Sequence, residues 1–166
     1  MRLIIGLLFF VCSTSQAMDV SLNEVRLLFN KSATNEACCK KLMNVLNVYN
    51  ETNNSTLAAY KACATMMMAS HMLNPFRKFS YFNNGKELLE KSVAADIENA
   101  EIRYLRFTIQ SNAPSFLGYN QLISNDKYFL IESLAGLKDL QLKKLIVVQL
   151  ESSEYVSSVE KQKLKL

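Results

Sequence analysis

The clearest indication of architecture in this chain is the segment Asn99-Ala100-Glu101-Ile102-Arg103-Tyr104-Leu105-Arg106-Phe107-Thr108-Ile109-Gln110. At 100° per residue, Ile102, Leu105 and Ile109 share one face of a helix. Tyr104 and Phe107 form a second apolar face on the far side. A helix that is apolar on both flanks belongs in the interior of a helical array. This segment therefore predicts a central helix and an all-α fold around it.

A narrow polar stripe lies between these two faces and carries Arg103, Arg106 and Gln110. Enclosed guanidinium groups need carboxylate, backbone or ligand oxygens, because an unpaired buried charge is very costly. One hypothesis is a ligand-binding pocket for an anion, built on these three residues with Lys86. The other is an internal network that joins helices, which is the usual state of buried arginines. The acids available for such pairing include Glu90, Glu101 and Asp126.

Amphipathic periodicity predicts further helices on both sides of the central one. The central helix is expected over about residues 100–112. The further helices cover about residues 22–31, 57–73, 86–95 and 139–151, with one more from Glu36 to about Asn50 and one between Asp126 and Gly136. Residues 153–166 are expected to form a loosely packed tail helix. Helices joined by short turns make a multi-helix array or bundle of about six to eight helices, and we assign residues 18–166 to a single domain.

Several boundaries of these helices are predicted from capping patterns. Ser21 and Glu24 have the spacing of a capping box, and the run Ser124-Asn125-Asp126 is expected to cap the helix that follows it. The residue before Pro75 is disfavoured in helical geometry, which predicts that the preceding helix ends there. An aromatic connection is then expected, closed by a turn at residues 83–85. Its aromatic residues are Phe76, Phe79, Tyr81 and Phe82.

The first 17 residues have the layout of a secretory signal peptide. Arg2 gives a positive start, residues 3–12 are an unbroken apolar run, and Ser15 and Ala17 are small residues at the −3 and −1 positions. We expect cleavage after Ala17, a periplasmic or secreted location, and no stable membrane insertion afterwards. A buried N-terminal helix is the alternative. A lipoprotein modified at Cys12 is disfavoured, because Val11 precedes that cysteine where a small residue is required.

Three cysteines lie beyond the signal: Cys38, Cys39 and Cys63. Export permits a disulfide, and adjacent cysteines on a helix point in different directions. At most one of the pair would therefore face Cys63, giving a Cys39–Cys63 or a Cys38–Cys63 bridge. Three free thiols are the alternative. A zinc site is not expected, because adjacent cysteines lack ligand spacing and His71 is the one histidine in the chain.

Composition and motifs argue against several classes of function. The net charge of +4 is too small and too dispersed to indicate nucleic-acid binding. His71 lies near Met66, Met67, Met68 and Met72, but methionines at helical spacing usually fill a core, so no metal or cofactor is expected. With one histidine and no nucleophile-elbow, zinc-protease or phosphate-loop motif, catalysis is not indicated.

Two local resemblances add to this interpretation. Residues 90–99 resemble the end of a tetratricopeptide-type (TPR-like) helix pair, although Ile97 replaces the proline of that pattern and no second copy is present. A longer match is carried by Asn74-Pro75, by Gly85-Lys86, by Asn99 to Gln110 and by Pro114-Ser115-Phe116-Leu117-Gly118-Tyr119. Over residues 74–128 the chain resembles a family of uncharacterised small exported proteins of Gram-negative bacteria. That resemblance implies export and an all-α fold, and no activity.

Two functions are consistent with these patterns. The first is a non-enzymatic protein-interaction module, in which a helical hairpin array with an aromatic connection offers a groove to a peptide or a partner helix. The second is a binder of small anionic ligands, or an unrecognised enzyme, that uses Arg103, Arg106 and Gln110. The surroundings of the arginines distinguish them, since a pocket requires guanidinium groups that no carboxylate of the fold engages.

Overall fold

A computed structural model describes residues 20–164, and within that range every regular element is helical, which confirms the all-α prediction. Short 3₁₀ turns lie at Ala69–His71 (η1) and Ser115–Leu117 (η2). The eight α-helices are α1 (Leu22–Ser32), α2 (Glu36–Val45), α3 (Ser55–Met68), α4 (Pro75–Ala95), α5 (Ala100–Asn112), α6 (Ile123–Ser133), α7 (Leu140–Ser152) and α8 (Ser158–Lys163).

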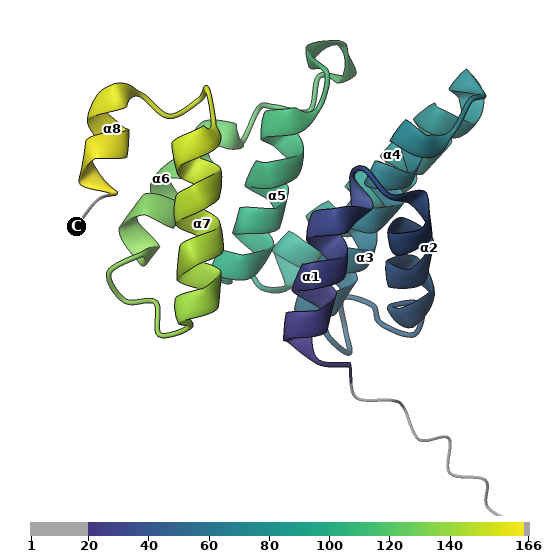
Figure 1. The fold of residues 1–166 in the computed structure, drawn as a ribbon, viewed down its shortest axis with the longest axis horizontal. Helices are drawn as coiled ribbons and strands as arrows, with labels where there is room; N and C mark the ends of the chain where they lie inside the picture. Colours follow the sequence, from purple (N-terminus) through teal and green to yellow (C-terminus); the bar gives the residue numbers. More distant parts are fainter. Residues whose placement is uncertain (1–19, 165–166) are drawn as a thin grey trace, which may run out of the picture.

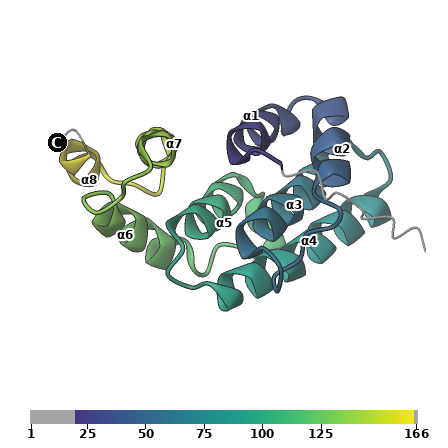
Figure 2. The same ribbon diagram turned by 90° about the horizontal axis from the view of Figure 1, so that it is seen from below.

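Helix α5 occupies the centre of the array, as its two apolar faces predict (Figure 1). It contacts α3 and α4 on one side and α6 and α7 on the other. Ile102, Leu105 and Phe107 are fully buried, so both faces of the helix are covered. Helices α1 and α7 lie on the same side of α5 in the view of Figure 2. The central helix thus joins the α1–α4 part of the chain to the α6–α8 part.

Helix α4 is longer than predicted, and the expected aromatic connection with its turn at residues 83–85 is wrong. Pro75 is the first residue of α4, a position where its missing N–H costs nothing. The side chain of Asn74 caps this end, accepting hydrogen bonds from the backbone N–H groups of Phe76 (2.9 Å) and Arg77 (3.2 Å). The proline therefore begins a helix here, and the aromatic residues lie on its first two turns.

Gly85 lies inside α4 at the closest approach of α4 to α3. A Cβ atom at this position would lie 2.6 Å from the carbonyl oxygen of Ala62 and 2.9 Å from the backbone nitrogen of Met66. Both atoms belong to the backbone of α3, so they cannot move aside as a side chain can. The glycine thus permits tight packing of α3 against α4, and a turn is not needed to explain it.

Gly85→Ala is expected to lower the free energy of unfolding by about 1–3 kcal/mol, because overpacking against the α3 backbone outweighs the gain in helix propensity. Chemical denaturation followed by circular dichroism measures the change. Gly136→Ala is the matched control, since a Cβ atom there has no neighbour closer than 4.0 Å. Equal stability of the two variants would contradict the close approach of α3 and α4.

Other boundaries also differ from the predictions. Ser21 precedes α1 without a capping hydrogen bond from its side chain, so the expected capping box is absent there. Helix α6 begins at Ile123, which places Asp126 inside the helix and makes its predicted capping role wrong. The tail helix α8 is shorter than expected. It is held by a capping box of Ser157 and Glu160 and by an ion pair of Lys127 with Glu160 at 2.8 Å.

The predicted signal peptide, residues 1–17, lies outside the described residues. Between residues 20 and 164, none of the helices combines the length and the apolar character needed to cross a membrane.

Candidate functional site

The described residues form an apolar groove with a volume of about 820 Å³. Its lining comes from the C-terminal ends of α1 and α3, from η1, from the first two turns of α4 and from α5. The segment 113–117, which includes η2, and one residue of α7 complete it. In Figure 1, η2 and the start of α4 lie at the same end of the molecule. The floor of the groove is formed by buried side chains: Phe29, Met66, Phe82, Tyr104 and Ile109.

Large apolar side chains remain exposed at the edge of this groove. Phe79 lines it and is 61% exposed, and Phe116 lines it and is 85% exposed. Nearby in sequence, Leu73 and Phe76 are 97% and 85% exposed. Contiguous exposed apolar surface next to a concavity is typical of interaction sites in soluble proteins, whereas isolated exposed apolar residues are common everywhere. The groove is therefore the candidate functional site.

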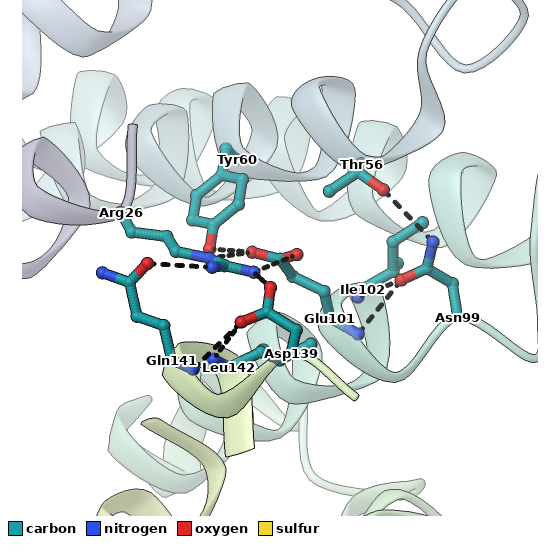
Figure 3. Close-up of polar contacts among 9 residues, drawn as sticks. All are labelled: Arg26, Thr56, Tyr60, Asn99, Glu101, Ile102, Asp139, Gln141 and Leu142. Atoms are coloured by element: carbon teal, nitrogen blue, oxygen red, sulfur yellow. Dashed lines mark hydrogen bonds and ion pairs between the residues drawn. The ribbon is translucent and has the colours of Figure 1, made fainter. Parts of the chain in front are cut away.

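Helices α1 and α5 both contribute residues to the groove, and buried hydrogen bonds fix these helices to each other (Figure 3). Arg26 of α1 donates from Nε and Nη2 to the two carboxylate oxygens of Glu101 of α5, at 2.7 and 2.8 Å. The hydroxyl group of Tyr60 of α3 donates to the same carboxylate at 2.7 Å. Arg26 and Glu101 are 2% and 6% exposed, so this bidentate pair is shielded from water.

The same arginine also ties α7 to the array. Its Nη2 atom donates to Asp139 at 2.7 Å and its Nη1 atom to Gln141 at 3.2 Å. Asp139 caps α7 as well, accepting from the backbone N–H groups of Gln141 and Leu142, both at 3.0 Å. We call Arg26, Tyr60, Glu101, Asp139 and Gln141 the Arg26 network. It lies about one helical turn from the groove along α1 and α5, because Phe29 and Tyr104 each follow a network residue by three positions.

The electrostatics of the Arg26 network favour a structural role. Burial opposes the charge on Arg26, but hydrogen bonds to Glu101 and Asp139 outweigh it and raise the pKa of Arg26. Burial, and then the negative charge of Glu101, raise the pKa of Tyr60. The hydrogen bonds from Arg26 and from the backbone lower the pKa of Asp139. Each group is thus held in its ordinary protonation state at neutral pH, which does not suit general acid–base chemistry.

The predicted site residues Arg103 and Arg106 form a second buried network, with Asp126 at its centre. Both guanidinium groups donate to Asp126, Arg103 through Nε and Arg106 through Nε and Nη2 at 2.7 and 2.9 Å. Arg106 also donates to Glu90 at 2.7 Å, and Glu90 accepts from the hydroxyl group of Tyr119. We call these five residues the Asp126 network. It joins α4, α5 and α6, as the internal-network hypothesis requires.

The other two predicted ligand-binding residues are placed differently. Gln110 is 1% exposed, and its Oε1 atom has no hydrogen-bond partner among the described residues. The ammonium group of Lys86 lies over the ring of Tyr119, 5.0 Å from its centroid. None of the four residues lines the groove. The geometry therefore gives the proposed anion pocket no open guanidinium group, because both arginines already engage carboxylates.

Cys38, Cys39 and Cys63 are free thiols in the structure, so neither expected bridge is present. The thiol of Cys39 donates to the carbonyl oxygen of Ala64 at 3.2 Å. Burial raises the pKa of Cys39 to about 11 and also raises the pKa of Cys63. Such thiols stay protonated at neutral pH and are poor nucleophiles and metal ligands. Within residues 20–164, no group of three or more His, Cys, Asp or Glu residues is placed to hold a metal ion.

The thiols give a direct prediction about reactivity. In the folded protein, Cys38 should react with a thiol reagent at pH 8, whereas Cys39 and Cys63 should react only after denaturation, because both are buried. Mass spectrometry of peptides labelled before and after denaturation measures this. A bridge to Cys63 would instead remove that cysteine and one of its partners from labelling even in denaturant, until a reductant is added.

The sequence predicts Phe79 and Phe82 in an aromatic connection, and the structure places both on α4, where they line the groove. The concave surroundings of these residues are not visible in the sequence. Arg26 was not recognised as a network residue, although a lone arginine beside Val25 on the apolar side of a predicted helix was a usable signal. Comparisons of the chain with models of protein families, with curated proteins and with solved structures found no match.

Proposed function

We propose that this chain is a non-enzymatic protein-interaction module whose apolar groove receives a helical segment of a partner protein. The observation that carries this proposal is the pairing of a buried floor with exposed aromatic edges in one concavity. Phe29, Met66 and Ile109 provide the floor, and Phe79 and Phe116 provide the edges. Large apolar side chains that fill such a groove are the usual source of binding energy at protein interfaces.

A helix suits this groove better than an extended strand. Recognition by strand addition needs an exposed sheet edge, and residues 20–164 contain no strand. Helix-in-groove recognition needs an apolar trough between helices, with adaptable side chains on its floor. Met66 and Met67 meet that need, because methionine is unbranched and fits differently shaped partners.

Further parts of the proposal come from the sequence. The signal-like residues 1–17 support a periplasmic or secreted location for this interaction. Residues 90–99 resemble the end of a TPR-like helix pair, and this resemblance also supports a protein-binding role. The alternative of an anionic pocket on Arg103, Arg106 and Gln110 receives no comparable support, because both guanidinium groups are engaged by Asp126.

A peptide probe tests the proposal. The chain contains no tryptophan, so the emission of a single tryptophan in a designed amphipathic helical peptide reports its burial without background. We expect binding, and we expect Phe79→Ala to weaken it about tenfold, as the loss of an aromatic anchor does.

Tyr128→Ala is the matched control, because Tyr128 is 56% exposed and lies outside the groove, against 61% for Phe79. This variant should bind the peptide as the unmodified protein does. Failure of the peptide to bind, or binding that Phe79→Ala leaves unchanged, would contradict the proposed function.

A further inference from the structure

We infer that the helical partner of the groove is acidic, with carboxylates bordering its apolar face where it meets α4. This inference rests on the proposed function and specifies the chemistry of the partner. It follows from the charge of the groove lining, in which Lys78 is the one charged residue.

The residues that line the groove include one charged side chain, Lys78, and no carboxylate. Lys78 immediately precedes Phe79 at the exposed edge, so its ammonium group borders the apolar surface. Arg77 is its neighbour, and both are exposed. Two long segments contribute to the groove, residues 72–86 and residues 102–125, and neither contains an Asp or a Glu. An apolar partner docking here would therefore place its own flank beside uncompensated positive charge.

Two other exposed lysines of the described residues have acidic partners on their own helices. Lys40 pairs with Glu36 and Lys91 pairs with Glu87, each at 2.7 Å and with the i,i+4 spacing of a helix. Among the described residues, Arg77 and Lys78 form no ion pair, and the positions one turn away from Lys78 on α4 hold no acid. Complementary charge at an interface sets partner choice and orientation more than total affinity. Lys78, the one charged residue of the groove lining, thus favours an acidic flank on the partner.

The partner that fits is an amphipathic helix with a defined pattern. Large apolar residues at positions i, i+3 or i+4, and i+7 would fill the floor. Glu or Asp residues beside that apolar stripe would face Lys78 and Arg77. A neutral helix would fill the apolar floor but would leave the positive charge of Lys78 unpaired. A fatty acid has both an apolar chain for the floor and a carboxylate for Lys78, so it is the main competing occupant.

Three helical peptides test the inference. They share one apolar face and one tryptophan, and they differ in the residues beside that face, which are Glu in the first, Gln in the second and Lys in the third. With the unmodified protein, we expect the Glu peptide to bind about fivefold more tightly than the Gln peptide, as a partly exposed ion pair permits. The preference should fall as salt rises. Lys78→Gln should abolish it, and Lys78→Glu should reverse it in favour of the Lys peptide.

Lys144→Glu is the control, because Lys144 is exposed on α7 outside the groove and the change alters net charge by the same amount. It should leave the order of the three peptides unchanged. Equal affinity for all three peptides, with binding still sensitive to Phe79→Ala, would overturn the inference and leave the proposed function standing. If no peptide binds while laurate does, both are overturned.

Discussion

Asp126→Asn is expected to lower the free energy of unfolding by about 3–5 kcal/mol, the usual cost of removing one partner from a buried ion pair. Asp126 is fully buried and accepts three hydrogen bonds from Arg103 and Arg106. An amide at this position keeps one acceptor oxygen but directs its NH₂ group towards a guanidinium donor. Arg103 and Arg106 would then compete for one acceptor, while Arg103 keeps its bond to the carbonyl oxygen of Ile97 and Arg106 its bond to Glu90.

Urea denaturation followed by circular dichroism measures this loss, and Glu132→Gln is the matched control. Glu132 is exposed on the same helix, so its change should shift stability by less than about 0.5 kcal/mol. Replacing Asp126 by Leu together with both arginines by Met should restore much of the lost stability. The carboxylate that then loses its arginine, Glu90, is only half-buried and still accepts from Tyr119. A loss below about 1 kcal/mol for Asp126→Asn would contradict the Asp126 network.

Glu101→Gln is expected to cost about 3 kcal/mol, because it removes the carboxylate that Arg26 binds through two hydrogen bonds. The loss in free energy of unfolding should lie at the lower end of the range for broken buried pairs, because Asp139 still accepts a hydrogen bond from Arg26. Because the Arg26 network fixes α1 to α5, and both helices line the groove, this variant should also weaken binding of the probe peptide.

Glu98→Gln is the control for this prediction. Glu98 is exposed and lies three residues earlier in the chain, so the same chemical change is made outside the network. Thermal unfolding should separate the two variants clearly, with Glu98→Gln close to the unmodified protein. If Glu101→Gln unfolds at the same temperature as Glu98→Gln, then the pairing of Arg26 with Glu101 contributes nothing to stability.

The sequence predicts the local part of this fold well. Helix α5 was expected over residues 100–112 and is observed at those bounds, because its apolar periodicity and its Asn99 cap are both local signals. The sequence also offers Asp126 and Glu90 as acids that can pair with the arginines of α5. The start of α4 was missed, since Pro75 is compatible both with the end of one helix and with the first turn of the next.

The long-range part could not be predicted in the same way. The pairing of Arg26 with Glu101 spans 75 positions, and that of Arg26 with Asp139 spans 113. No periodicity within one helix specifies which distant helix faces it. The groove depends on the same information, because its floor combines Phe29, Met66 and Ile109 from three helices. Its aromatic edge was visible in the sequence, but its concave shape was not.

Methyl resonances of methionine offer the most direct test of the groove as a binding site for an acidic helix. Met66 and Met67 line the groove, whereas Met43 lies on α2 outside it. On titration of the labelled protein with the Glu-flanked peptide, we expect the methyl signals of Met66 and Met67 to shift together and saturate, with Met43 unchanged. Saturable binding that leaves Met66 and Met67 unshifted would place the partner elsewhere and contradict the account.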